Sequence, residues 1–317
     1  MFRRLLLAWY QESQRKLPWR GATDPYHILV SEIMLQQTRV AVVEERYTKF
    51  IAQFPSAERL SRAKEATVLA AWTGLGYYRR ARALHGAAKE IVRRGSFPRI
   101  VPDLMALPGV GRYTASAVAS IAFGEPVAVV DGNVKRVIDR LVNRKTQPTD
   151  ANTEKQRWEI AGQLLDRQSP GDFNQAMMEL GALVCLPTQP LCHACPVAAL
   201  CGARGPMERA ERSTRRKAEL HYALARRNGS ILLRQRNKQR SLMPGMWELP
   251  ELEAASNESK SPLLKLRHSI TTTDYTVFVH DEKKRKRQGD RWVPLRSIDR
   301  LPLTGLTRKI IRGLGDA

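Results

Sequence analysis

The feature that most restricts the fold of this 317-residue chain is the grouping of its cysteines. All four lie in one short segment, with the spacing C-x6-C-x2-C-x5-C. Four thiols so close together in a long chain favour a metal site over disulfides. Four thiolates hold either a tetrahedral zinc ion or a [4Fe–4S] cluster. The spacing alone leaves both open, although one wrapped loop with three closely spaced ligands suits the cluster better. The predicted ligands are Cys185, Cys192, Cys195 and Cys201.

The chain is strongly basic. It has 53 Lys and Arg residues against 31 Asp and Glu, a formal net charge of +22 and a pI of about 10.4. Such a surface attracts polyanions, of which nucleic acid is the commonest and an anionic membrane the alternative. The apolar run in Met1–Tyr10 ends too early, at Gln11–Lys16, for a signal peptide, and no stretch approaches a membrane-spanning length. We therefore expect a cytoplasmic protein that faces nucleic acid and binds no membrane.

The first two thirds of the chain show the pattern of successive amphipathic helices separated by Pro and Gly. Asp24 before Pro25 has the chemistry of a helix cap followed by a first-turn proline. No convincing strand is found before Gly202, so a mainly α region is expected over residues 1–203. A second helix is indicated by apolar residues at i, i+3, i+4 and i+7, namely Val134, Val137, Ile138 and Leu141.

The last third of the chain has a different pattern. Residues 204–219 are charged and lack a clear apolar face, which predicts an inter-domain linker. Residues 220–317 are expected to form a smaller α+β domain. Within it, strands are predicted at Ser230–Leu233 and Tyr275–His280, a loop at Asn257–Pro262, a charged turn at Glu282–Arg287 and a closing helix at Thr307–Leu314.

A short glycine-containing segment, LPGVGRY, lies between two helical stretches. Gly109 and Gly111 permit a tight turn, and the helix that follows, Arg112–Phe123, presents its free backbone N–H groups there. Such groups bind phosphate without reading base sequence. The same pattern can simply join two packed helices, but in so basic a chain we favour phosphate binding.

Two carboxylates have neighbours that are unusual for surface acids. Glu32 lies in the apolar segment YHILVSEIMLQQT, where burial favours the protonated form and suits a general acid. Asp131 follows an apolar run and precedes Gly132-Asn133 at a helix start. The alternatives are an acid on the polar face of its helix for Glu32 and an ordinary helix cap for Asp131.

Five segments together resemble the signature segments of the MutY adenine glycosylases, within the endonuclease III or helix-hairpin-helix superfamily. They are SEIMLQQT, WTGLGYY, LPGVGRYTA, VVDGNVKRV and FNQAMMELG, and they occur in that family's order. The four-cysteine spacing is also that of the superfamily. The resemblance covers nearly all of residues 1–202. It implies a two-lobed helical glycosylase domain with a [4Fe–4S] cluster in the loop 185–201.

The resemblance also implies roles for individual residues. Glu32 matches the acid that protonates adenine, and Asp131 matches the carboxylate that stabilises the cationic sugar. Tyr113 and Asn133 match the residues that support this intermediate. The matches to DNA-contact residues are Trp19 and Arg20 at the adenine pocket, Gln37 and Tyr77 at the duplex, and Gln175 near the acid. Apart from the resemblance, Gly109 and Gly111 are the expected phosphate contacts, and Lys135, close to Asp131 in the sequence, could trap an opened sugar.

The implied reaction is the hydrolysis of the N-glycosidic bond of adenine flipped out of an A:8-oxoguanine or A:G mispair. One alternative is an endonuclease III-type lyase, which carries a Schiff-base lysine where this chain has Tyr113. We therefore expect a monofunctional enzyme. Another alternative is a catalytically silent DNA-binding relative, which has no need for Glu32 in an apolar segment.

The C-terminal region resembles the MutY domain related to Nudix hydrolases. It lacks the glutamate-dense pattern that holds magnesium, since only Glu251, Glu253 and Glu258 follow Pro250. The resemblance implies recognition of 8-oxoguanine rather than nucleotide hydrolysis. Where relatives have Phe-Ser-His this chain has Ile270, Thr271 and Thr272. We expect Thr271 and Thr272 to make the contact; the alternative is weakened discrimination between 8-oxoguanine and guanine. We expect a monomer that acts on double-stranded DNA in the nucleoid.

Overall fold

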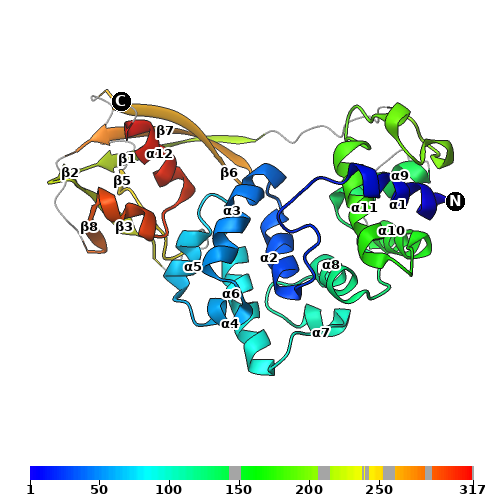
Figure 1. The fold of residues 1–317 in the computed structure, drawn as a ribbon. Helices are drawn as coiled ribbons and strands as arrows, with labels where there is room; N and C mark the ends of the chain where they lie inside the picture. The colour runs from blue at the N-terminus through cyan, green and yellow to red at the C-terminus, as the bar shows by residue number, and fades with distance from the viewer. Residues whose placement is uncertain are drawn as a thin grey trace. The chain divides into compact units, whose positions relative to one another are not determined.

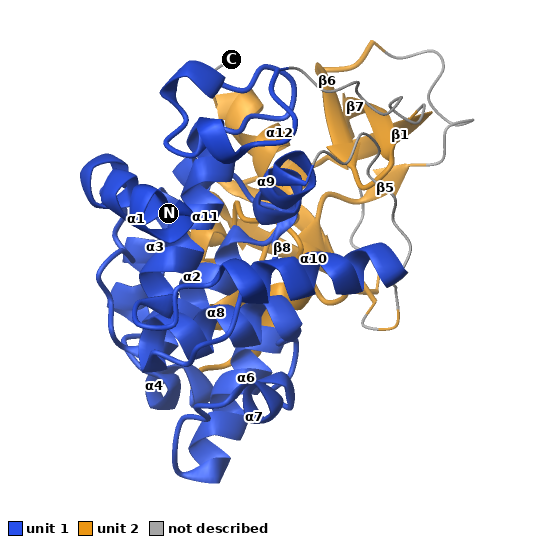
Figure 2. Cartoon of the chain, turned by 90° about the vertical axis from the view of Figure 1, so that its right-hand side faces the viewer, with its two compact units in different colours: residues 1–62, 83–210 blue, residues 63–82, 211–317 orange. Residues whose placement is uncertain are grey.

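The computed structural model describes residues 1–142, 151–205, 215–237, 239, 243–252, 261–282 and 288–315 (Figure 1). The chain divides into two compact units (Figure 2). Unit 1 comprises residues 1–62 and 83–210, and unit 2 comprises residues 63–82 and 211–317.

Unit 1 is helical, and its described residues contain no strand. This confirms the mainly α expectation for the first part of the chain. Helix α6, Arg79–Arg94, starts in unit 2 and continues into unit 1. The other helices of unit 1 are α1 (Phe2–Ser13), α2 (Pro25–Leu35), α3 (Val40–Gln53), α4 (Ala57–Ser61), α7 (Val101–Met105), α8 (Arg112–Phe123), α9 (Gly132–Leu141), α10 (Ala151–Leu164) and α11 (Pro170–Leu183).

Two helix starts follow from local chemistry as predicted. The side chain of Asp24 accepts a hydrogen bond from the Tyr26 backbone N–H, with Pro25 in the first turn of α2. The side chain of Asp131 caps α9 in the same way. Helix α9 then buries Val134, Val137 and Ile138 on one face.

Helix α8 connects the two groups of helices in unit 1. It packs against α2 and α7 on one side and against α11 on the other. Helices α1, α9 and α11 and the cysteine loop share one apolar core around Phe173 and Leu180. The start of α11 approaches α8 closely at Gly171, where an added Cβ would lie 2.9 Å from the Ser120 carbonyl oxygen. This packing sets α2, α8, α9 and α11 around one site.

The described residues of unit 2 form two four-stranded sheets. The first has the order β5-β1-β7-β6, in which β1 and β7 are parallel and the other pairs antiparallel. In the second, β3 pairs with β2, β4 and β8. The elements are α5 (Glu65–Ala71), β1 (Arg216–Leu224), β2 (Arg226–Arg227), β3 (Ser230–Gln235), β4 (Trp247–Glu248), β5 (Glu251–Leu252), β6 (Leu264–Ile270), β7 (Thr273–Asp281), β8 (Asp290–Pro294), the 3₁₀ helix η4 (Leu295–Arg300) and α12 (Gly305–Gly315).

The predicted strands and closing helix of the C-terminal region are confirmed, but two boundaries differ from expectation. The linker prediction is wrong at residues 216–219, because β1 begins at Arg216 and pairs with β7 along its whole length. Residues 63–82, assigned to the helical domain, group with the C-terminal sheets instead. The rest of the linker (206–214), most of the predicted loop (257–260) and the charged turn (283–287) lie outside the described residues.

The turn between α7 and α8 needs only one of its two glycines for backbone reasons. Gly109 has φ of 73°, and an added Cβ there would lie 2.3 Å from the Cβ of Ala83 on α6. Gly111, the residue before α8, has an ordinary φ of −89°. Gly111 is therefore compatible with the turn but is not required there by its backbone conformation. Gly109 alone combines a left-handed backbone with a close approach of another helix.

We predict that Gly109→Ala lowers the free energy of unfolding by about 2–4 kcal/mol, from backbone strain and overlap with Ala83. The matched control is Gly162→Ala in α10, where no described atom lies within 4 Å of the added Cβ. That change is expected to stabilise the protein by up to ~1 kcal/mol. Urea unfolding followed by circular dichroism measures both, and equal effects would contradict the prediction.

Candidate active site

The first component of the site is a buried carboxyl on α2. Glu32 is 5% exposed, and its Oε2 accepts a hydrogen bond of 2.5 Å from the Tyr113 hydroxyl. Burial raises the pKa of Glu32 above its ordinary value, the Tyr113 hydrogen bond and the Arg20 charge oppose this, and the Asp131 charge adds to it. Glu32 therefore keeps its proton to a higher pH than an exposed glutamate. The alternative of an acid on the polar face of its helix is wrong, because the side chain is buried.

The hydrogen-bond partner of Glu32 comes from the second residue of α8. The Tyr113 hydroxyl also lies 3.5 Å from the Met178 sulfur on α11. Burial and the charges of Glu32 and Asp131 hold the pKa of Tyr113 well above its ordinary value. The residue is therefore a neutral hydroxyl that remains a hydrogen-bond donor throughout the physiological pH range.

The second carboxyl stands at the start of α9. Asp131 Oδ1 accepts from the Val134 backbone N–H at 2.7 Å, and Oδ2 accepts from the Asn133 amide at 3.0 Å. Burial raises the pKa of Asp131, and these hydrogen bonds oppose the rise. The helix-cap alternative is correct, but it does not exclude a second role, because the Asp131 charge also acts on Glu32 and Tyr113.

Asn133 is fixed from two sides. Its Oδ1 accepts from Nη2 of Arg136 at 2.8 Å. It also packs against α11 so closely that a Cβ at Gly181 would lie 2.5 Å from the Asn133 Cβ. Its amide therefore has a fixed direction toward Asp131.

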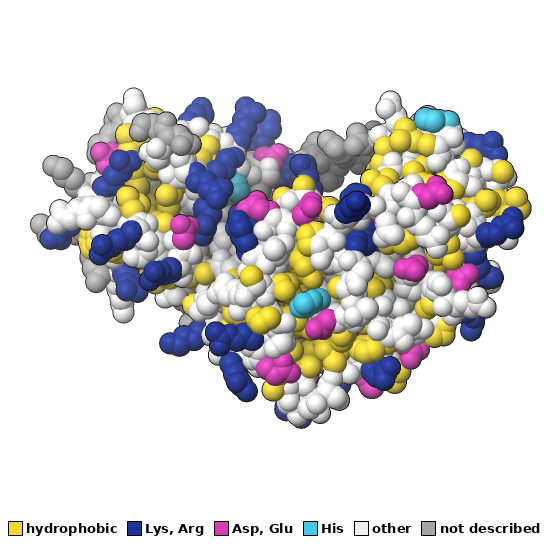
Figure 3. Space-filling model, in the orientation of Figure 1, with side chains coloured by type: hydrophobic (Ala, Val, Ile, Leu, Met, Phe, Trp, Pro, Cys, Tyr) yellow, Lys and Arg dark blue, Asp and Glu magenta, His cyan; other side chains and the backbone are white. Residues whose placement is uncertain are grey.

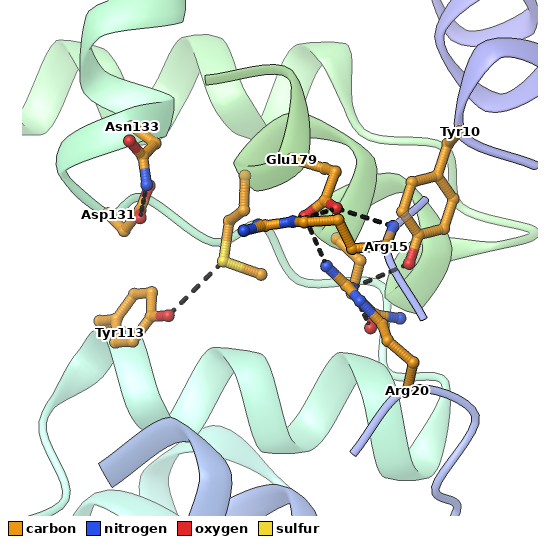
Figure 4. Close-up of polar contacts among 9 residues, drawn as sticks. Tyr10, Arg15, Arg20, Tyr113, Asp131, Asn133 and Glu179 are labelled. Atoms are coloured by element: carbon orange, nitrogen blue, oxygen red, sulfur yellow. Dashed lines mark hydrogen bonds and ion pairs between the residues drawn. The ribbon is translucent and has the colours of Figure 1, made fainter. Parts of the chain in front are cut away.

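A network of cations and acceptors lies beside these groups (Figure 4). The Arg20 guanidinium donates to the Tyr10 hydroxyl at 2.8 Å, to Glu179 at 2.8 Å and to the Gln175 side-chain oxygen. Glu179 also accepts from the Arg15 backbone at 3.0 Å and from the Arg15 guanidinium twice at 2.8 Å. The predicted contact residues Arg20 and Gln175 are thus brought together.

The sequence analysis did not identify Glu179 or Arg15. Glu179 is 1% exposed, and its pKa is lowered because the Arg15 hydrogen bonds and the charges of Arg20 and Arg15 outweigh the effect of burial. The sequence does contain a pattern that points to Glu179, because this acid lies in the apolar stretch FNQAMMELG, four residues after Gln175. The same argument that selected Glu32 would have selected it.

The four cysteines line one small cavity of ≈ 30 Å³. Arg140 reaches the same cavity and donates to the Cys185 sulfur at 3.1 Å and to the Leu186 carbonyl at 2.7 Å. Burial raises the pKa of Cys195 and of Cys201, and the neighbouring thiols add to the rise. Among the described residues, no three His, Cys, Asp or Glu side chains are grouped to hold a single metal ion.

Three other residues of unit 1 with predicted DNA contacts differ in their surroundings: one is buried, one is exposed and one is in an ion pair. Trp19 is buried, with its ring centroid 5.3 Å from that of Tyr47 on α3. Gln37 is exposed and has a positive φ of 55°. The Lys135 side chain pairs with Glu154 on α10 at 2.7 Å. This ion pair holds the Lys135 side chain toward α10.

Unit 2 contains the remaining predicted contact residues. Tyr77 is 50% exposed with φ of 45°, and Thr271 is exposed at the β6–β7 turn with φ of 50°. Thr272, also exposed, is the next residue of that turn. A pocket of ≈ 510 Å³ within this unit is lined by both Tyr77 and Thr271, together with His268.

Basic side chains are spread over the visible surface, with acidic ones between them (Figure 3). No helix in the described part of the chain is both long enough and apolar enough to cross a membrane.

Comparisons with known proteins identify relatives of this chain. Residues 30–163 match the HhH-GPD superfamily, described as base excision DNA repair proteins. A human protein named adenine DNA glycosylase is 47% identical over 218 residues, which is 65% of this chain and 40% of that protein. The chain spans 40–59% of the length of the curated relatives it matches.

Two solved structures share the helical fold. A thermostable thymine-DNA glycosylase has a TM-score of 0.58 and 32% identity, covering 63% of this chain and 93% of that one. An endonuclease III trapped on DNA has a TM-score of 0.53 and 23% identity, covering 63% of this chain and 92% of that one.

Glu32 and Glu179 are predicted to contribute to the free energy of unfolding with opposite pH dependences. Glu32 keeps its proton to a higher pH when folded, so its contribution to stability is full below the ordinary pKa of 4.5 and is lost as pH rises. Glutamine stays neutral and still accepts from Tyr113. Glu32→Gln should therefore match the wild type at about pH 4 and be more stable at about pH 8.

Glu179 is the matched control, because its folded pKa is lowered and its contribution is present above the ordinary pKa and lost on acidification. Glu179→Gln should lower the free energy of unfolding at neutral pH by about 3 kcal/mol, since it leaves two cations without their shared acceptor. Denaturant unfolding across pH measures both variants. If the free energies of unfolding of the two variants, each relative to the wild type, changed with pH in the same way, the surroundings of Glu32 and Glu179 would not differ as described.

Proposed function

Since this chain belongs to the HhH-GPD superfamily of base excision DNA repair proteins, in its MutY-type group, we propose that it excises adenine from mispairs in double-stranded DNA. The observation that carries the proposal is the buried, proton-retaining Glu32 bonded to Tyr113, with Asp131 acting on both. The substrates proposed are A:8-oxoguanine and A:G mispairs. A monomer in the cytoplasm, at the nucleoid, is part of the same proposal.

The proposed chemistry divides the work between the two carboxyls. Adenine is a poor leaving group as an anion, so Glu32 delivers its proton to N7 as the C1′–N9 bond breaks and the bonding electrons leave with the base. The sugar becomes cationic, and Asp131 stabilises it at close range. A water molecule then adds to C1′ and loses its proton, which leaves an abasic site. Tyr113 and Asn133 hold the two carboxyls in place.

The same residues argue for hydrolysis rather than strand cleavage. A lyase needs an amine at the sugar, and this chain has the Tyr113 hydroxyl at the position where the resemblance places the catalytic lysine. Lys135, the nearest alternative, is paired with Glu154. The proposed product is therefore an intact strand that carries an abasic site.

A [4Fe–4S] cluster is the proposed occupant of the cysteine cavity. Four thiols from one loop line one cavity, which fits a group held by four thiolates, and the single wrapped loop suits a multi-iron cluster better than a tetrahedral zinc ion. Cys185, Cys192, Cys195 and Cys201 would hold it, and its role would be to fix the loop.

Unit 2 is the proposed lesion-recognition domain, of the Nudix-like class. Thr271 is a β-branched residue held at positive φ on an exposed turn, a conformation that recurs at ligand-contact sites. The Thr271 carbonyl accepts from Arg215 at 2.8 Å, which fixes the turn. We assign contact with the base opposite adenine to Thr271 and Thr272, with Tyr77 and Gln37 entering the duplex and the Gly109–Gly111 turn binding phosphate.

We predict that Glu32→Gln slows single-turnover adenine release at least ~100-fold, the lower end of what general acid catalysis contributes. The substrates are duplexes with adenine opposite 8-oxoguanine, guanine or thymine, and alkali reveals the abasic sites. The matched control is Glu179→Gln, in which another buried glutamate is changed to the same amide. At low pH this variant should release adenine faster than Glu32→Gln does.

The outcomes separate the alternatives. Strand cleavage without alkali, with borohydride trapping that survives Lys135→Ala, would indicate the lyase. Tight DNA binding by the wild type without base release would indicate a silent binder. Equal rates opposite guanine and 8-oxoguanine would remove the lesion-specific part of the proposal.

Replacement of one proposed cluster ligand should remove the metal. We predict that Cys195→Ala loses iron, loses the broad visible absorption of an iron–sulfur centre and unfolds more easily. His193→Ala, in the same loop, is the control and should retain both. One zinc per chain and no iron in the wild type would contradict the cluster assignment.

A further inference from the structure

Beyond the residues already assigned, one buried acid stands out because its contacts end at the active site. Glu179 Oε2 accepts from the same Arg20 guanidinium that donates to Gln175. Glu179 and Gln175 are four residues apart on α11 and therefore share one face of that helix. Arg20 is thus held between two acceptors from a single helix, with the Tyr10 hydroxyl as a third.

We propose that Glu179 is a positioning residue, which fixes the Arg20 guanidinium on α11 and so limits how much of its positive charge reaches Glu32. The proposal deepens the proposed function, because it rests on Glu32 being the acid. Glu179 touches neither Glu32 nor Tyr113 in the contacts given above, and it acts through Arg20.

The charge argument has a definite sign. The Arg20 charge lowers the pKa of both Glu32 and Tyr113. The negative charge of Glu179 offsets part of that effect and keeps the guanidinium in place. If Glu179 becomes neutral, the positive charge of Arg20 is less compensated and less restrained, so the Glu32 carboxylate is favoured and its pKa falls.

The charged and titratable groups that act on Glu32 and on Glu179, among the described residues, come from several elements. Glu32 is surrounded by Tyr113 from α8, Asp131 at the start of α9 and Arg20 from the segment between α1 and α2. Glu179 is surrounded by Arg15, Arg20 and Tyr10, and the charges of Glu44 on α3 and Asp172 on α11 act on Arg15 and Tyr10. Arg15 is the cation in this set that contacts Glu179 without contacting Gln175.

Arg15 therefore supplies a control of opposite sign. Arg15→Gln removes a positive charge and leaves Glu179 with Arg20, so the pKa of Glu32 should rise. Glu179→Gln removes the negative charge, so the pKa of Glu32 should fall. Glu179→Asp keeps the charge on a shorter side chain and should rescue the pH dependence even if the rate at the optimum falls.

The experiment is the pH profile of single-turnover adenine release by the full chain, kept below its unfolding temperature. The rate falls as pH rises and Glu32 loses its proton. We expect this alkaline limb to move down by about half a pH unit or more in Glu179→Gln, a threefold or greater loss on the limb. It should move up in Arg15→Gln and stay in place in Glu179→Asp.

A loss of rate at all pH values with an unmoved limb would overturn the proposal, because a purely structural residue would have that effect. If Glu179→Gln does not fold, an unmoved limb in Arg15→Gln overturns it equally.

A second readout does not depend on activity. Carboxyl ¹³C NMR of the free protein, with the Glu32 signal identified by its absence in Glu32→Gln, reports the Glu32 pKa directly. If the wild type releases no adenine but the Glu32 pKa falls in Glu179→Gln and rises in Arg15→Gln, the proposed function is rejected and the positioning role is retained.

Discussion

The site depends on the hydrogen bond between Tyr113 and Glu32, made where α8 meets α2 in the interior. A buried carboxyl is costly unless its charge is paired or its proton retained. Here the single hydroxyl partner and the apolar surroundings favour the proton. The packing of α8 between α2 and α11 keeps that partner in place, so the helical architecture and the acidity of Glu32 have the same origin.

The second carboxyl is linked to the cysteine loop through one side chain. Arg136 donates to the Asn133 oxygen, to the Gly181 carbonyl and to the Cys185 carbonyl. Asn133 in turn donates to Asp131. Three hydrogen bonds thus connect the Cys185 carbonyl, through Arg136 and Asn133, to the Asp131 carboxylate.

The sequence allowed the mainly α region, the start of α2 at Asp24 and the burial of Glu32 to be predicted, because each depends on residues close together in the chain. It did not allow the grouping of residues 63–82 with the C-terminal sheets, which rests on contacts between distant segments such as the Tyr78 hydroxyl and the Leu303 carbonyl. The positive φ angles of Gln37, Tyr77 and Thr271 were equally hidden, since no glycine marks them. They coincide with positions where the family resemblance places DNA contacts, as expected if local strain is retained at functional sites.

The hydrogen-bond partners of Glu32 and Asp131 differ in a way that fits the different roles proposed for them, although burial raises the pKa of both. Asp131 is held by the Val134 N–H and the Asn133 amide N–H, which only donate and so favour the ionised form. Glu32 is held by a hydroxyl, which donates to a carboxylate and accepts from an acid. Glu32 can therefore release and regain a proton without losing its partner, whereas a proton on Asp131 would oppose its hydrogen bonds. The difference between an N–H and an O–H neighbour therefore supports the proposed roles of Glu32 as the acid and Asp131 as the counter-charge.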